Sequence, residues 1–196
     1  MAGNVSSSGK QRWRVELEAR RRALSPQDVQ AKSGEVETHL AALSFFKDAR
    51  RIALYAAQPF EVQTKGLFAL AGPRAVFPRV VGKGQPLALH AVASAAELVA
   101  GTLGLLEPRA GAPALAPHEI DLWIIPGVGF TRGGERLGRG AGYYDRTLAL
   151  ARPGAPRVGI CFACCLVDAL PTESWDARMD WVVTEREALR CQRVGE

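Results

Sequence analysis

No apolar run in this chain approaches the roughly 18 residues of a membrane-spanning helix, although 47% of its 196 residues are hydrophobic. The first residues, MAGNVSSSGKQRWR, lack the apolar core of a signal peptide, and Glu16 and Glu18 are unusual in a transit peptide. These absences predict a cytoplasmic protein with no membrane partner. The length and hydrophobic content suit one full core, so we expect a single domain over residues 1–196, flexible at residues 1–9.

Cysteine is scarce, and its distribution suits reduced thiols better than a disulfide framework. The chain has four cysteines, and three of them stand in one apolar segment, GICFACCL. Such crowding favours reduced thiols, which we expect to be buried and inert. The spacing Cys161-x-x-Cys164 leaves a metal or redox site as the weaker alternative, because no second C-x-x-C pair and no nearby histidine accompany it.

Two common signatures of nucleotide binding are also missing. No Gly-Lys-Ser/Thr follows the glycines of residues 127–142, so the chain has no Walker A loop. Gly138, Gly140 and Gly142 are spaced G-x-G-x-G, which is not the dinucleotide-binding fingerprint. The formal net charge of +5 suits an anionic small molecule and does not require nucleic acid.

A nucleic-acid-binding module is nevertheless an alternative, because arginines gather near the N-terminus at Arg12, Arg14 and Arg20–Arg22. The aromatic residue among them, Trp13, belongs to the apolar stripe of a predicted helix rather than to a series that could stack on bases. The acidic residues of the same helix interrupt the basic run. We therefore expect no nucleic-acid partner.

The most informative feature present is a glycine- and arginine-rich segment after the apolar run Leu122–Pro126. It contains Gly127, Gly129, Gly133, Gly134, Gly138, Gly140, Gly142, Arg132, Arg136 and Arg139. Glycines let backbone N–H groups approach a ligand closely, and such a loop before a helix forms an anion site. Forked guanidinium donors suit phosphate oxygens, and Asp145 is a hard oxygen ligand for magnesium. We interpret the segment as a nucleoside triphosphate site, with a solvated surface loop as the alternative.

Short continuous apolar runs alternate with helical patterns along the chain. The predicted strands lie in Arg51–Ala56, Ala75–Phe77, Leu122–Ile125, Val158–Phe162 and Trp181–Val183. The predicted helices are Gln11–Leu24, a helix capped by Ser25 that reaches Leu43, Thr64–Leu70, Ser94–Gly101 and Tyr143–Leu150, with Glu107–Ala116 as a surface connection. Continuous apolar strands indicate a sheet covered on both faces. The alternation predicts an α/β fold, a single three-layer α/β/α domain with a mainly parallel sheet.

Candidate site residues follow the predicted strands, where ligands of open α/β sheets gather. Glu61 follows the first strand, Arg79 the second, and the glycine- and arginine-rich segment the third. Lys10 and Arg14 share one face of the first predicted helix, and a bound polyanion would turn their mutual repulsion into attraction. A plain solvated face is the alternative for these two cations.

These motifs resemble those of a known family, and the resemblance covers nearly the whole chain. Its most specific part is PGVGF at residues 126–130 with RLGRGAGYYD at residues 136–145. The other matching residues are Lys10, Arg14, Arg21–Ser25, Glu61–Thr64, Phe77–Arg79, Gly104–Pro108, Leu170, Pro171, Trp175, Asp176, Asp180 and Val183–Glu185. The chain resembles the 5-formyltetrahydrofolate cyclo-ligase family, also called the 5,10-methenyltetrahydrofolate synthetases.

The resemblance implies ATP- and magnesium-dependent cyclisation of 5-formyltetrahydrofolate to 5,10-methenyltetrahydrofolate, with release of ADP and phosphate. The oxygen of the amide-like N5-formyl group is a poor leaving group, and phosphorylation would turn it into a good one that N10 can displace. Phosphoryl transfer needs positioning and charge neutralisation more than a protein nucleophile. This need agrees with a sequence that offers arginines, glycines and carboxylates. The implied substrate carries a polyglutamate tail or lacks one, and we expect a monomer.

The resemblance also implies roles for individual residues. The implied ATP contacts are Lys10, Arg14, Arg136, Leu137, Gly138, Arg139, Gly140, Ala141, Gly142, Tyr143 and Tyr144, of which Arg139 and Tyr144 are also the implied catalytic residues. The implied folate contacts are Ala56, Glu61, Arg139, Gly140, Ala141, Gly142 and Tyr143. Glu61 would bind the N–H groups of the pterin, and Arg79 would meet the glutamate tail. Asp145 and Asp176 are the implied magnesium ligands.

Some positions depart from the family pattern. Ala141 stands where some members have lysine, Leu87 and Leu89 where a methionine lines the folate pocket, and Cys165 where a glutamine is common. The implied phosphate and magnesium groups all remain, so we expect activity. A paralogue that acts on another N-formyl compound is the alternative within the same fold; it would keep the ATP loop and change the pocket around Glu61.

Overall fold

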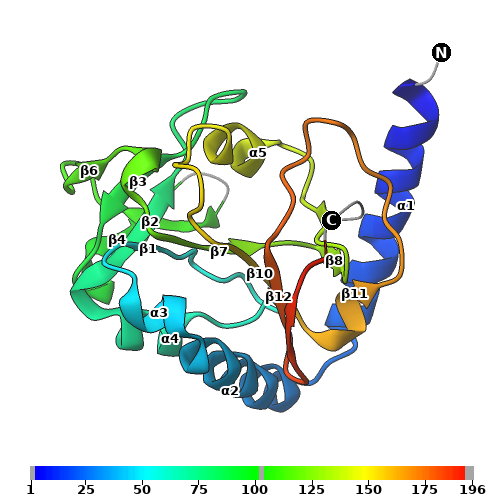
Figure 1. Ribbon diagram of the computed structural model, residues 1–196, viewed down its shortest axis with the longest axis horizontal. Coiled ribbons are helices and arrows are strands. Elements are labelled where there is room, and N and C mark those ends of the chain that lie inside the picture. Colours follow the sequence, from blue (N-terminus) through cyan, green and yellow to red (C-terminus); the bar gives the residue numbers. More distant parts are fainter. Residues whose placement is uncertain (1–2, 102–103, 193–196) are drawn as a thin grey trace.

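The computed structural model describes residues 3–101 and 104–192, and a central sheet runs through the middle of the molecule (Figure 1). In spatial order its strands are β13 (Ala188–Arg190), β12 (Trp181–Val183), β10 (Arg157–Ile160), β7 (Leu122–Pro126), β1 (Ile52–Ala53), β2 (Ala75–Arg79), β3 (Ala88–Ala91) and β6 (Ala114–Leu115). The strands from β12 to β2 are all parallel. Within the described residues, the antiparallel pairs of this sheet are β13 with β12, β3 with β2, and β6 with β3. The predicted α/β fold with a mainly parallel sheet is therefore confirmed.

Helices cover both faces of this sheet. Below it in Figure 1 lie α2 (Pro26–Ala42), α3 (Ser44–Asp48) and α4 (Lys65–Ala71), and α5 (Tyr143–Leu148) lies above it. The long α1 (Gly3–Arg22) stands at one side, where Leu17 joins the same apolar core as Leu148 of α5. Side chains of β7 alternate between the two cores: Leu122 and Ile124 face one, and Trp123 and Ile125 the other. A three-layer arrangement results.

Smaller elements surround the sheet. One small sheet joins β11 (Leu166–Val167), β8 (Gly129–Thr131) and β9 (Arg136–Leu137), and another joins β4 (Leu98–Ala100) to β5 (Leu106–Pro108). The 3-10 turns are η1 (Gly72–Arg74), η2 (Ala95–Glu97), η4 (Pro117–Glu119) and η5 (Ala163–Cys165). Helix α1 packs on η5 through the Cys165 thiol, which donates to the Leu17 carbonyl at 3.7 Å.

Several sequence predictions need correction. The helix expected at Ser94–Gly101 is wrong: Ser94 and Glu97 form a capping box, but it opens only the turn η2, and strand β4 follows. The surface connection Glu107–Ala116 includes strand residues of β5 and β6. Helix α1 begins at Gly3, and residues 1–2 lie outside the described part of the chain, so the expected flexibility of residues 1–9 stays a prediction.

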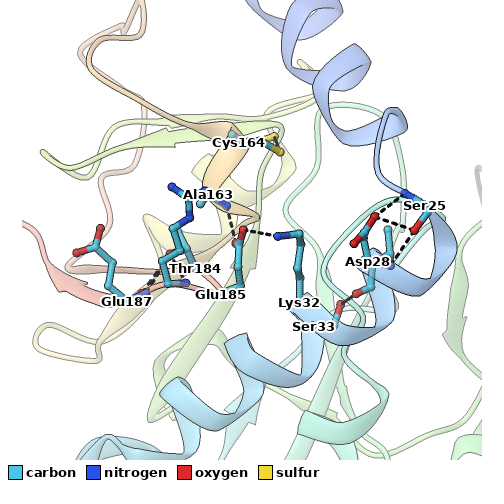
Figure 2. A network of polar contacts seen from close by, with 12 residues as sticks. Ser25, Asp28, Lys32, Ser33, Ala163, Cys164, Thr184, Glu185 and Glu187 are labelled. Atoms are coloured by element: carbon cyan, nitrogen blue, oxygen red, sulfur yellow. Dashed lines mark hydrogen bonds and ion pairs between the residues drawn. The ribbon is translucent and has the colours of Figure 1, made fainter.

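Helix α2 connects loops that follow the carboxyl ends of the parallel strands. Its predicted cap is confirmed, because Ser25 and Asp28 form a reciprocal capping box. Lys32 pairs with Glu185 at 3.2 Å, and Glu185 accepts the Ala163 N–H at 2.6 Å, as Figure 2 shows. The hydroxyl of the next residue, Ser33, accepts the backbone N–H of Gln63 at 2.9 Å. These contacts join the loops that follow β12, β10 and β1. Within the described residues, no helix is both long enough and apolar enough to cross a membrane.

Candidate active site

The segment of residues 136–145, called the loop below, consists of strand β9, an irregular stretch at residues 138–142 and the first turn of α5. Arg136 and Leu137 pair with β8, and the loop then passes Gly140 and Gly142, both with positive φ (99° and 65°). Left-handed backbone is costly for other residues, so the glycines are needed here to turn the chain into the helix. Arg139, Gly140 and Ala141 are exposed, whereas the Leu137 side chain is buried in the core. The exposed middle of the loop is therefore the part open to a ligand.

Helix α1 lies directly against this loop. The Arg14 Nε donates to the Gly138 carbonyl at 2.9 Å, and a Cβ on Gly140 would lie 3.2 Å from the Arg14 guanidinium. One turn earlier, the Lys10 Nζ lies 2.7 Å from an Asp176 Oδ2. The two cations are thus held at the loop by defined partners, so the alternative of a plain solvated face is not supported for them.

The loop also meets Glu61, which follows β1. An Arg139 Nη2 donates to Glu61 Oε1 at 2.8 Å, and an Arg21 Nη1 lies 3.8 Å from the same oxygen. The side chains of Glu61 and Arg21 are 9% and 7% exposed, while that of Arg139 is 49% exposed. Arg139 is therefore the solvent-facing partner of a buried ion pair. This contact brings the predicted phosphate loop and the predicted pterin carboxylate together.

A second ion pair lies at the start of α5. An Arg136 Nη2 donates to Asp145 Oδ1 at 2.6 Å, and the Arg136 guanidinium lies 5.6 Å from the centre of the Tyr144 ring. The Arg136 Nε is buried and has no hydrogen-bond partner in the described chain. Burial raises the pKa of Tyr144 despite the opposing charge of Arg136, and Glu61 raises it further. Tyr144 is therefore a neutral phenol at physiological pH.

Asp145 and Asp176 are held by one segment of the chain. Asp145 Oδ1 accepts the Ala177 N–H at 3.2 Å, and Asp176 Oδ2 accepts the Glu173 N–H at 2.8 Å. Among the described residues, no group of three or more histidine, cysteine or acidic side chains could by itself hold a metal ion. Magnesium, however, keeps several waters and substrate phosphates and needs only one or two carboxylates from the protein. Asp145 and Asp176 are carboxylates of the kind that such an ion uses, and each has a cation of the protein as its partner here.

Two cavities lie beside these groups. The first has a volume of about 280 Å³ and is lined by Glu18, Arg21, Arg22, Gln58, Pro59, Phe60 and Arg139. The second has a volume of about 260 Å³ and is lined by Glu135, Arg136, Thr172, Glu173, Ser174, Asp176, Ala177 and Arg178. Arg139 borders the first cavity and Arg136 the second, so the loop contributes a guanidinium to each.

Other predicted residues lie elsewhere. The side chain of Ala56 packs against the core on the α2 face, so only its backbone remains for a ligand. Arg79 lies beside β5, with its Nε 4.0 Å from Glu107 and an Nη1 3.4 Å from the Pro108 carbonyl. Leu87 and Leu89 are buried, and the Leu87 N–H donates to the Thr147 hydroxyl of α5 at 2.8 Å. Cys165 is buried against α1, which accounts for an apolar thiol at this position.

Sequence reasoning missed several residues of the first cavity. It assigned no ligand contact in the ATP or folate site to Glu18, Arg21, Arg22 or the turn residues Gln58–Phe60, although Arg21 and Arg22 belong to the family resemblance. A helical reading of α1 could have placed Glu18 and Arg21 near Arg14, because residues three or four apart share a face. Nothing local in the sequence links Arg21 to Glu61, since the contact depends on how α1 crosses the sheet.

The cysteines agree only in part with the expectation of buried, inert thiols. Cys161 and Cys165 are buried, but Cys164 and Cys191 are half-buried. A hydrogen bond with the Cys165 thiol, Sγ to Sγ 3.9 Å, lowers the pKa of Cys164 to about 7. Burial raises the pKa of Cys161, and it raises that of Cys191 to about 11. Cys164 is therefore the thiol expected to react.

Comparison with known proteins points to one family. The model of the 5-formyltetrahydrofolate cyclo-ligase family matches residues 6–185. The 5-formyltetrahydrofolate cyclo-ligase of Escherichia coli K12 is 32% identical over 175 residues, which cover 86% of this chain and 96% of that protein. The corresponding Mycolicibacterium smegmatis protein is 32% identical over 197 residues, which cover 96% and 100%. The NMR structure of Aquifex aeolicus 5,10-methenyltetrahydrofolate synthetase superposes with a TM-score of 0.84 at 31% identity, over 95% of both chains.

Proposed function

Because the chain belongs to the 5-formyltetrahydrofolate cyclo-ligase family, and is by that membership a ligase of folate metabolism, we propose that ATP drives its cyclisation of 5-formyltetrahydrofolate. The products are 5,10-methenyltetrahydrofolate, ADP and phosphate. The γ-phosphoryl group passes to the formyl oxygen, N10 attacks the formyl carbon and loses its proton, and phosphate leaves. The residues of the site need only bind, orient and neutralise charge for this chemistry.

The observation that carries the proposal is the contact between Arg139 and Glu61. Phosphoryl transfer to the folate requires the phosphate site and the pterin site to share a border. Arg139 lies on that border, because it belongs to the 136–145 loop and contacts the carboxylate assigned to the pterin. Its half-exposed guanidinium is able to turn from Glu61 towards a phosphate oxygen, which makes it our candidate catalytic residue.

We assign the triphosphate to the groups where α1 meets the loop. Lys10, Arg14 and Arg136 supply cations, and the exposed backbone of residues 138–142 supplies N–H donors. Arg136 has a buried Nε without a partner in the described chain, and a ligand oxygen would satisfy it. The neutral Tyr144 beside Arg136 donates a hydrogen bond from its hydroxyl group to an oxygen of the reacting groups and keeps its proton.

We assign the folate to the side of Glu61. Its carboxylate accepts N–H groups of the pterin, while the backbone of Ala56 and the loop backbone with Tyr143 border the substrate. Asp145 and Asp176 would hold magnesium, which supplies neutralisation of the charge on the phosphates. When the triphosphate arrives, Arg136 and Lys10 turn to phosphate oxygens, and the two aspartates lose their protein cations.

We also propose that the protein is a single-domain monomer in the cytoplasm. We propose further that it has no nucleic-acid or membrane partner and that its substrate occurs with or without a polyglutamate tail.

The decisive experiment mixes the protein with ATP, magnesium and 5-formyltetrahydrofolate and follows the near-ultraviolet absorbance of the methenyl product. We expect product formation that depends on ATP, with ADP and phosphate released in equal amounts. ATP binding without product would favour a paralogue that uses another N-formyl compound. Salt-sensitive RNA binding without ATP turnover would instead support the nucleic-acid alternative.

A further inference from the structure

An unusual turn stands at the edge of the first cavity. The Glu61 N–H donates to the Gln58 carbonyl at 3.1 Å, so residues 58–61 form a four-residue turn. Pro59 fixes a negative φ at the second position, and Phe60 has a φ of 65° at the third. This combination corresponds to a type II turn, whose third position favours glycine or asparagine. Phe60 is the only residue other than glycine with positive φ in the described chain.

The turn does not need the side chain of Phe60. Glu61 Oε2 accepts the Gln58 N–H at 3.0 Å. The Gln63 side-chain amide donates to the carbonyls of Gln58 and Glu61, at 3.2 Å and 2.8 Å. The Ser33 hydroxyl of α2 accepts the backbone N–H of Gln63, as described above. The surroundings therefore impose the left-handed backbone, and a large β-carbon substituent there only adds strain.

Core packing does not account for the phenylalanine either. Its ring belongs to neither apolar core of the described residues, and the residue is 36% exposed. Phe60 lines the 280 Å³ cavity together with three arginines, Arg21, Arg22 and Arg139, and one acidic residue, Glu18. A flat apolar surface beside several cations suits an aromatic ring that carries polar or anionic groups.

We infer that Phe60 stacks on a flat aromatic ring of the folate and thereby positions the substrate beside Arg139 and Glu61. This inference rests on the function proposed above. A cavity of this size is at the lower limit of ligand pockets, so it takes one ring system of the folate rather than the whole molecule. The pyrimidine half of the tetrahydropterin and the aminobenzoyl ring are the flat aromatic rings of this substrate, and either has the required chemistry. On this inference, the strain of the turn is offset by the contact that the Phe60 ring makes with the substrate in the cavity.

Four variants separate stacking from a structural role. Phe60→Gly removes both ring and strain, Phe60→Asn tolerates positive φ, Phe60→Leu keeps the strain without the ring, and Phe60→Tyr keeps the ring. In Phe60→Gly and Phe60→Asn we expect a roughly tenfold higher KM for 5-formyltetrahydrofolate, a KM for ATP within about twofold, and an unliganded Tm that is equal or up to about 4 °C higher. Phe60→Leu should show the higher KM without a gain in Tm, and Phe60→Tyr should behave like the wild type.

A matched control removes another exposed apolar side chain. Leu70 of α4 is 47% exposed and borders neither cavity, so Leu70→Ala should leave both KM values unchanged. Competition with a free pterin and with aminobenzoylglutamate identifies the ring, because Phe60→Gly should weaken inhibition by one of them roughly tenfold.

Three results would overturn the inference. They are an unchanged folate KM in Phe60→Gly, a Tm lowered by several degrees, and equal inhibition of wild type and variant by both fragments. If the wild-type protein neither binds nor converts 5-formyltetrahydrofolate, the proposed function fails and the inference falls with it. If the wild type is active and Phe60→Gly matches it, only the inference fails.

Discussion

The Arg139 guanidinium lies 2.8 Å from the Glu61 carboxylate, although 78 positions separate the two residues in the sequence. Arg21 approaches the same carboxylate oxygen from α1. Three segments that are remote in sequence thus meet at one charged group. This relationship makes stability and activity separable by mutation.

Glu61→Gln should lower the free energy of unfolding by about 2–4 kcal/mol, because it leaves the buried Arg21 without its counter-charge. Arg139→Ala should lower it by less than about 1 kcal/mol, since Arg139 is half exposed and water replaces its contact. Urea denaturation of both variants measures the difference. Equal losses would show that Glu61 does not balance the charge of Arg21.

Arg139→Ala should reduce kcat/KM for ATP by a factor of about 10–150, which corresponds to about 1.5–3 kcal/mol for a lost charge-assisted hydrogen bond. Arg139→Lys should recover only part of this loss, because an ammonium group lacks the forked donors. Arg132→Ala is the matched control, since Arg132 precedes the same loop and pairs with Glu187 in solvent. Equal effects of the two alanine variants would argue against a specific role for Arg139.

Asp145→Asn should raise the magnesium concentration that gives half-maximal activity, because a neutral amide is a weaker ligand for a hard cation. Its oxygen still accepts from Arg136 and from the Ala177 N–H, so the fold should persist. The same titration on Asp176→Asn tests the second carboxylate. Asp48→Asn, in the exposed helix α3, is the control. An unchanged magnesium dependence in Asp145→Asn would remove Asp145 from the metal site.

Cys164 should be the first thiol to react with iodoacetamide. Only the thiolate is a nucleophile, and the lowered pKa of Cys164 means that its thiolate fraction grows as the pH rises through about 7. The alkylation rate should therefore increase between about pH 6 and pH 8 and level off above, whereas Cys191 should need a pH near 11. Mass spectrometry of digests locates the label. Cys164→Ser should remove the fast phase, and a fast phase that survives would assign it to another thiol.

Two glycine substitutions should change stability in opposite directions. A Cβ at Gly159 of β10 would lie 2.3 Å from the Phe130 ring, so Gly159→Ala should destabilise the protein by about 1–3 kcal/mol. A Cβ at Gly34 of α2 meets no atom within 4 Å, so Gly34→Ala should stabilise it by about 0.5–1 kcal/mol. Thermal unfolding of both variants checks the signs. A stabilising Gly159→Ala would show that the core beside Phe130 is loosely packed.

Local patterns predicted the parts of the fold that depend on neighbouring residues. The capping box of Ser25 and Asp28 and the apolar run of β7 are both in the structure. The helix expected at Ser94–Gly101 is wrong because pairing of β4 with β5, which depends on residues outside the segment, decides its second half. The antiparallel strand β3 carried no local signal that sequence reasoning recognised.

The sequence alone identified the residues with suitable chemistry: the glycines of the proposed phosphate loop, the arginines within it, and carboxylates after the strands. Their spacing was sufficient because loops and caps depend on residues a few positions apart. Only the tertiary structure decided the partners: Glu61 with Arg139 and Arg21, Lys10 with Asp176, and Arg14 with Gly138. Each of these contacts joins segments that the parallel sheet brings together from distant parts of the chain, and hydrophobic periodicity carries no information about such pairings.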